Sequence, residues 1–118
     1  MRFLRRRHAR FPTTGHAGDD MLLEQLATQS DLSAGRHWVH YLYVGDEAAA
    51  RVAAGEIEAA GWVIDRVDEA AEGPGWVVIA EKHDVVVSPE AVVAARELFE
   101  GVAARVPGGD YDGWEASV

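Results

Sequence analysis

The histidines are the residues of this chain best suited to bind a metal ion or transfer a proton near neutral pH. The sequence has five histidines and no cysteine, so a thiolate nucleophile or thiolate metal site is excluded. His37 and His40 lie three residues apart in a segment of strand composition, so their side chains point to opposite faces and cannot bind one ion together. His83 stands beside Asp84 at the end of a predicted strand, where a solvated polar pair is the ordinary arrangement. We therefore predict no metal site.

The carboxylate pairs and the serines give no stronger indication of catalysis. Asp65 with Asp68, and Asp110 with Asp112, could act as acid and base only in a pocket that separates their pKa values. Both pairs lie where turns or strand edges are expected. No serine has the strand–turn–helix context of a nucleophile elbow, and the glycine motifs of nucleotide-binding proteins are missing from the sequence. We predict a protein that is not an enzyme, with no catalytic residues and no cofactor.

The charge distribution favours a protein partner over nucleic acid. The net charge is -9, and all 20 acidic residues lie after residue 18, whereas residues 1–18 contain five arginines. An acidic body repels nucleic acid and is attracted to basic surfaces, although the same charge could serve only to keep the domain soluble. No stretch has the length and apolarity of a membrane span, and we expect a soluble, cytoplasmic protein without membrane contact.

Hydrophobic periodicity predicts the elements that must position these groups. We expect a flexible basic arm over residues 1–18 and one domain over 19–118. The predicted elements are, in chain order, a helix at 19–30 that Asp19-Asp20 can cap, a strand at 36–44, a helix from Asp46 to Gly61, strands at 62–67 and 76–81, a helix from Ser88 that ends before Pro107, and a strand from Asp110 onward.

After the first helix, this order is that of two split βαβ units. Such units form an α+β ferredoxin-like plait (βαββαβ), in which a four-stranded antiparallel sheet carries both helices on one face. The second sheet face, which we call the open sheet face, is then either exposed or covered by the short N-terminal helix or by another subunit.

The segment from Gly108 to Glu115, with the sequence GGDYDGWE, combines two aromatic residues and three acids around a glycine. An unbroken period of two would place Tyr111 and Trp114 on opposite sides of an edge strand. Gly113 inside a strand indicates a bulge or a close approach. The rings could be packing residues while the acids protect the sheet edge, or all of them could contact a partner.

His40 shares its predicted strand face with Trp38 and Leu42. This histidine is either a half-buried core residue or a partner contact on an open sheet face. The residues that we predict as partner contacts are Trp38, His40, Asp110, Tyr111, Asp112, Trp114 and Glu115.

The motif Tyr111-Asp112-Gly113-Trp114 resembles the signature ending of the regulator of ribonuclease activity B (RraB) family, which inhibits ribonuclease E. His40-Tyr41-Leu42-Tyr43 followed by glycine and acid, the Ala60-Gly61-Trp62 segment and the order of elements add to the resemblance, which covers about residues 19–116. It implies a non-enzymatic, acidic ferredoxin-like protein that binds a basic region of ribonuclease E outside the catalytic domain and lowers or redirects RNA turnover. An acidic body fits an arginine-rich partner independently.

A second hypothesis belongs to another class of function. The protein could be a structural or ligand-sensing module whose open sheet face dimerises or holds a small molecule. Trp38, Trp62 and Trp76 motivate this hypothesis as possible aromatic residues of that face.

Overall fold

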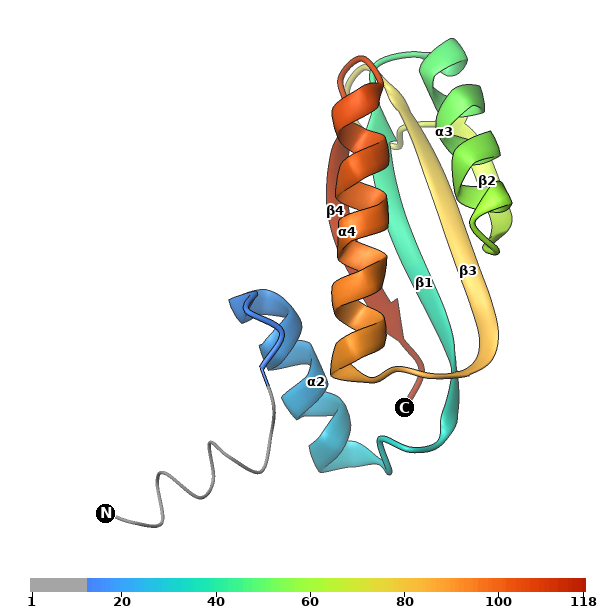
Figure 1. The fold of residues 1–118 in the computed structure, drawn as a ribbon. Helices are drawn as coiled ribbons and strands as arrows, with labels where there is room; N and C mark the ends of the chain where they lie inside the picture. The colour runs from blue at the N-terminus through green and yellow to red at the C-terminus, as the bar shows by residue number, and fades with distance from the viewer. Residues whose placement is uncertain (1–12) are drawn as a thin grey trace.

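The computed structural model describes residues 13–118 (Figure 1). Its elements are, in chain order, α2 (Ala17–Gln29), β1 (Gly35–Val44), α3 (Glu47–Ala59), β2 (Val63–Glu69), β3 (Trp76–Val86), α4 (Pro89–Arg105) and β4 (Asp110–Ala116). Residues 1–12 of the predicted basic arm lie outside the described residues, and α2 begins two residues before the predicted start of the domain. Among the helices described for residues 13–118, none is long and apolar enough to cross a membrane.

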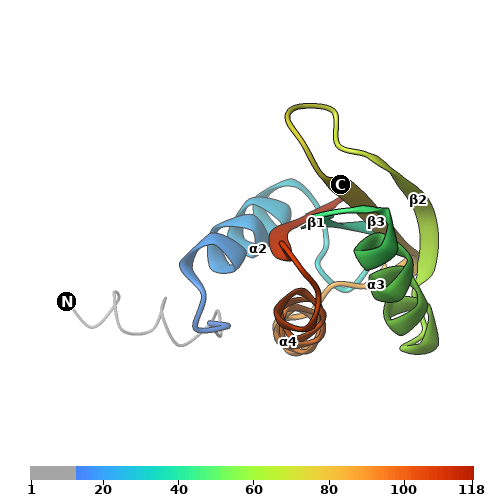
Figure 2. The same cartoon turned by 90° about the horizontal axis from the view of Figure 1, so that it is seen from above.

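The four strands form one antiparallel sheet in the order β2-β3-β1-β4. Helices α3 and α4 lie side by side on one face of this sheet, and α2 packs beside α4 near the β4 edge (Figure 2). The architecture is the predicted α+β ferredoxin-like plait with an additional N-terminal helix.

The helix starts follow from local sequence. Asp46 caps α3 by accepting a hydrogen bond from the Ala49 amide at 2.8 Å, and Ser88 caps α4 with Pro89 in its first turn, as predicted. The start of α2 differs from the prediction. His16 is its N-cap, and its Nδ1 accepts from the Asp19 amide at 3.2 Å, which leaves the Asp19 carboxylate free to enter the interior.

The hydrophobic core fills the space between the sheet and the helices. Alternate residues of β1 point into it, and their buried side chains are Trp38, His40, Leu42 and Val44. The predicted inward face of α4 is confirmed, since Val92, Ala95, Phe99 and Val102 are buried. Helix α3 contributes small residues and Ile57, which allows it to lie close to the sheet.

A β-bulge near the start of β4 changes which way its side chains point. Tyr111 and Gly113 pair with consecutive residues of β1, so Asp112 is an extra residue without a partner of its own. Gly113 has a φ of 101°, a conformation that favours glycine. The extra residue puts Tyr111 and Trp114 on the same, helix-facing side of the sheet. The prediction that they lie on opposite sides was wrong because it assumed an unbroken period of two.

The glycine immediately before β4 is explained by a close approach of two backbones. A Cβ atom added to Gly109 would overlap the backbone carbonyl of Ala103 in α4. The chain can therefore turn from α4 into β4 within a few residues. Tyr111 then lies on the helix-facing side of the sheet, beside Phe99.

Candidate functional site

The residue at the centre of the candidate site is Asp19, whose side chain enters the interior from the first turn of α2 and is 2% exposed. Arg96 of α4 donates to both of its oxygens, with Nε–Oδ2 of 2.7 Å and Nη2–Oδ1 of 3.0 Å. The indole Nε1 of Trp114 in β4 donates to Oδ1 at 2.9 Å. One buried carboxylate thus joins three segments that are far apart in the sequence.

This carboxylate is ionised at neutral pH. Burial alone raises the pKa of Asp19, but the hydrogen bonds from Arg96 and Trp114 outweigh it and hold the pKa below its ordinary value of 3.8. The bond to Asp19 in turn raises the pKa of Arg96 above its ordinary value, so the guanidinium stays charged. Asp19 and Arg96 form a permanent ion pair that links helices, and neither group is suited to transfer protons near pH 7.

His40 is completely buried in the middle of β1. Its ring stacks on Phe99 with centroids 4.4 Å apart, and its Nδ1 shares a hydrogen bond of 2.7 Å with the Tyr111 hydroxyl. Burial lowers the pKa of His40 to about 3 and raises that of Tyr111, so both groups are neutral at pH 7. Of the two alternatives left open by the sequence, His40 is a core residue.

Arg96 also connects its ion pair with Asp19 to the hydrogen-bonded pair of His40 and Tyr111. Its guanidinium lies 4.8 Å from the centre of the Tyr111 ring, a cation–π contact. We call Asp19, His40, Arg96, Tyr111 and Trp114 the buried polar cluster. Two of its members belong to the terminal YDGW motif, whose rings therefore hold α2 and α4 against the sheet. The role of the cluster is structural. It contains an ion pair and several hydrogen bonds, but none of its five side chains titrates near neutral pH.

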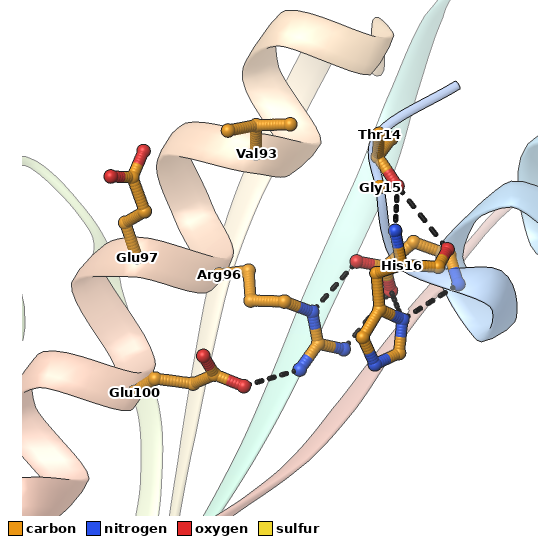
Figure 3. Close-up of a pocket in the computed structure, with 8 residues that line it drawn as sticks. Thr14, Gly15, His16, Val93, Arg96, Glu97 and Glu100 are labelled. Carbon is orange, nitrogen blue, oxygen red and sulfur yellow. Dashed lines mark hydrogen bonds and ion pairs between the residues drawn. The ribbon is translucent and has the colours of Figure 1, made fainter.

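An open cavity of about 250 Å³ lies between the start of α2 and α4, next to the buried polar cluster. Figure 3 shows Arg96 reaching from α4 toward the Thr14–His16 segment, with Glu100 bonded to its outer side. The Arg96 Nη1–Glu100 distance is 2.8 Å, and the other two guanidinium nitrogens bond Asp19. All three nitrogens of Arg96 are engaged, and Glu97 and Glu100 also line the cavity. Among the described residues that line it, no arginine or lysine is therefore free to bind an anionic ligand.

Another arginine, Arg36, is buried and joins two distant segments, which sequence reasoning did not foresee. Arg36 of β1 is 4% exposed, and its Nη1 donates to Ser30 Oγ at 2.8 Å and to the Ser117 carbonyl at 3.0 Å. Its Nη2 donates to the Asp31 carbonyl at 2.5 Å. The guanidinium joins the loop after α2 to the end of β4.

The predicted partner contacts separate into two groups. The side chains of Trp38, His40 and Trp114 are buried in the interior, where they pack in the core. Tyr111 is half-buried, and the three acids of the terminal segment, Asp110, Asp112 and Glu115, are exposed. A binding role for these four residues stays a prediction.

The open sheet face combines tyrosines with acids. Tyr41 and Tyr43 of β1 alternate with the inward residues, and strand register puts Glu81, Asp110, Glu115 and Asp68 on the same side. The Tyr41 hydroxyl donates to Glu115 at 2.7 Å, and chiefly this bond raises the pKa of Tyr41 to about 12. Tyr41 is therefore a neutral donor next to the Glu115 carboxylate.

The three tryptophans that suggested small-molecule binding or dimerisation through the open sheet face do not lie on that face. Trp38 and Trp62 are buried beneath the helices, and Trp76 packs partly buried against the same core. The reason is their register: each lies on the helix-facing side of the sheet or at its margin. The aromatic residues of the open sheet face are tyrosines instead.

Sequence reasoning missed Asp19 and Arg96 because no local pattern connects residues 77 positions apart. A signal was present in α2. Asp19, Leu23 and Leu26 recur at helical spacing, which places the aspartate on the apolar stripe, but the carboxylate was interpreted as a helix cap.

The fold and its site define a class: an acidic ferredoxin-like plait with an N-terminal helix fastened by a buried ion pair. A family model described as regulator of ribonuclease activity B matches residues 16–116. The chain belongs to this RraB family, which confirms the resemblance indicated by the terminal motif. A comparison with curated proteins found no match to this chain.

Proposed function

We propose that the protein is a non-enzymatic regulator that binds ribonuclease E in the cytoplasm, at a basic region outside the catalytic domain, and lowers or redirects RNA turnover by occupying that region. Membership of a family described as regulators of ribonuclease activity supports a ribonuclease as the target. The absence of cysteine from the sequence fits a reducing compartment.

The observation that carries this proposal is the pairing of tyrosines with carboxylates on the open sheet face. Tyr41 and Tyr43 offer ring surfaces, and Asp68, Asp110 and Glu115 offer exposed carboxylates around them. Arginine side chains stack on aromatic rings and pair bidentately with carboxylates. This surface therefore suits an arginine-rich segment.

The strength of such a complex depends on salt. The chain has a net charge of -9, so its encounter with a basic segment is accelerated by long-range attraction, which salt screens beyond about 10 Å at 0.1 M. Acidic groups on the same face would oppose contact between two copies of the chain, which counts against the alternative of a dimer formed through this face.

The test is recovery of ribonuclease E on the immobilised full chain from an extract of the native host. We expect recovery at low salt and loss at high salt. A face variant, Asp68→Asn with Asp110→Asn and Glu115→Gln, should lose recovery at low salt. A matched variant with three exposed helix acids changed, Glu24→Gln with Glu58→Gln and Glu97→Gln, removes the same charge and should retain it.

Two results would overturn the proposal. Failure to recover ribonuclease E at any salt concentration removes the partner. Equal weakening by the face variant and the matched variant would mean that net charge alone causes the binding, and the open sheet face would then have no specific role. Sedimentation of the free chain as a dimer that the face variant dissociates would favour the dimerising module instead.

A further inference from the structure

Two histidines and a glutamate converge on the open sheet face, away from the buried polar cluster. His37 lies in β1, and Glu81 and His83 lie in β3. The Nε2 atoms of both histidines point at the same carboxylate oxygen of Glu81, at 2.5 Å from His37 and 3.2 Å from His83. The two imidazole rings stack with centroids 4.2 Å apart and planes 7° apart. We call these residues the His–Glu cluster.

Strand register creates this cluster. Glu81 and His83 are two residues apart on β3, so their side chains share one face. Between the pairs Trp38–Lys82 and Arg36–Val85, β1 contributes only His37, whereas β3 contributes His83 and Asp84. Asp84 accommodates the bulge with a φ of 54°. All three donor side chains are thus carried by paired strands, a rigid base for a ligand site.

The donor set is that of a transition-metal site. Two imidazole nitrogens and one carboxylate oxygen, with a fourth position left to water, are a known ligand set for Zn²⁺, which binds such atoms at roughly 2.0–2.2 Å. The donor atoms of the His–Glu cluster all lie within 4.8 Å of one another. The histidine side chains are 43% and 64% exposed, so they can adjust around an ion and an ion can reach them.

We propose that His37, Glu81 and His83 bind one divalent transition metal ion, with Zn²⁺ as the occupant that best matches the donor set. This revises our prediction from sequence, which excluded a site formed by His37 with His40 and treated His83 alone. His40 lies on the helix-facing side, as expected, but the second imidazole comes from a neighbouring strand. The ion is held through three side chains and keeps one solvent-facing position.

The test uses the full chain without a polyhistidine tag, dialysed against a chelator and titrated with Zn²⁺ by calorimetry. We expect one ion per chain, a rise in the thermal midpoint with added Zn²⁺, and tetrahedral Co²⁺ absorption bands when Co²⁺ replaces it. His37→Ala and His83→Ala should each weaken binding by more than about tenfold, and Glu81→Gln should also weaken it. His16→Ala is the matched control, because His16 lies near a different carboxylate, that of Asp19.

Circular dichroism checks that each variant is folded, and His37→Gln and His83→Gln provide milder changes if an alanine variant is not. Binding that survives both histidine substitutions, or that is lost only in His16→Ala, would overturn the proposal. So would the absence of Zn²⁺ binding and of any shift in thermal midpoint in the unmodified chain. None of these outcomes depends on whether ribonuclease E is the partner.

Discussion

Arg96 of α4 donates two hydrogen bonds, of 2.7 and 3.0 Å, to Asp19 of α2, a residue 77 positions earlier in the sequence. The indole of Trp114 donates a third hydrogen bond to the same carboxylate. The N-terminal helix is therefore attached to the plait by a buried charge as well as by Leu23 and Leu26. Loss of either partner leaves the other charge poorly solvated.

Asp19→Ala should destabilise the domain by about 3 kcal/mol, because Arg96 and the Trp114 indole lose their shared acceptor. Urea denaturation followed by circular dichroism measures the free energy of unfolding. Glu24→Gln, on the exposed side of the same helix, is the control and should change it by less than about 0.5 kcal/mol. Equal effects of the two substitutions would contradict a structural role for the ion pair.

Trp114→Ala should cost about 3 to 5 kcal/mol of stability, because the ring is 7% exposed and packs against Trp38. Trp114→Phe keeps most of the ring volume but loses the bond to Asp19, and we expect a smaller loss of about 2 kcal/mol. The two values from urea denaturation separate packing from hydrogen bonding. An unchanged thermal midpoint in Trp114→Ala would show that the ring does not support the core.

The stability of the domain should fall as the pH is lowered from about 6.5. The pKa of His40 is about 3 in the folded state and about 6.5 when unfolded, so between these values the unfolded state binds one more proton. Each pH unit in this range then costs roughly 1 kcal/mol. Asp19 has a lowered pKa and contributes in the same direction only in more acidic solution.

The measurement for this prediction is the free energy of unfolding of the unmodified chain and His40→Gln at several pH values between about 5 and 7. The difference between the two curves isolates His40 from Asp19, Arg96 and Lys82, the charged groups that act on it. We expect the His40→Gln curve to be flatter. Parallel curves would mean that His40 binds protons equally in the folded and unfolded states, so that folding does not lower its pKa.

Gly113→Ala should destabilise the domain by about 1 to 3 kcal/mol, because a φ of 101° strains any residue with a Cβ. Gly55→Ala gives the opposite expectation. Gly55 is exposed in the middle of α3 with open space around it, so alanine should stabilise by about 0.5 to 1 kcal/mol. Thermal denaturation of the two variants compares them directly, and a neutral Gly113→Ala would argue against the bulge.

Sequence reasoning succeeded where structure is decided locally. Asp46 and Ser88 mark helix starts by capping chemistry, and the apolar spacing from Val92 to Val102 identifies the buried side of α4. From the order of elements the plait follows, since few topologies accommodate two split βαβ units. The terminal motif indicated the family, and both of its rings lie on the helix-facing side of the sheet, where Trp114 is buried and Tyr111 is half-buried.

What the sequence could not supply was register. The pairing of β1 with β3 decides that His37 lies beside His83, and one extra residue at Asp112 decides which way Tyr111 points. Gly113 indicated a bulge but did not determine its effect on the faces. The Asp19–Arg96 pair depends on how α2 docks, which is a property of the assembled fold.

The bulge in β4 also separates the residues that set the surface charge of this strand from the residues that stabilise the core. Because both rings of the terminal motif turn inward, the solvent side of the strand carries only acids at positions 110, 112 and 115. Substitution of these acids alters the charge of the strand without creating a cavity in the interior. Substitution of Tyr111 or Trp114 creates a cavity but leaves the charge unchanged. A lineage could therefore change the charge of this strand while the stability of the domain stays nearly constant.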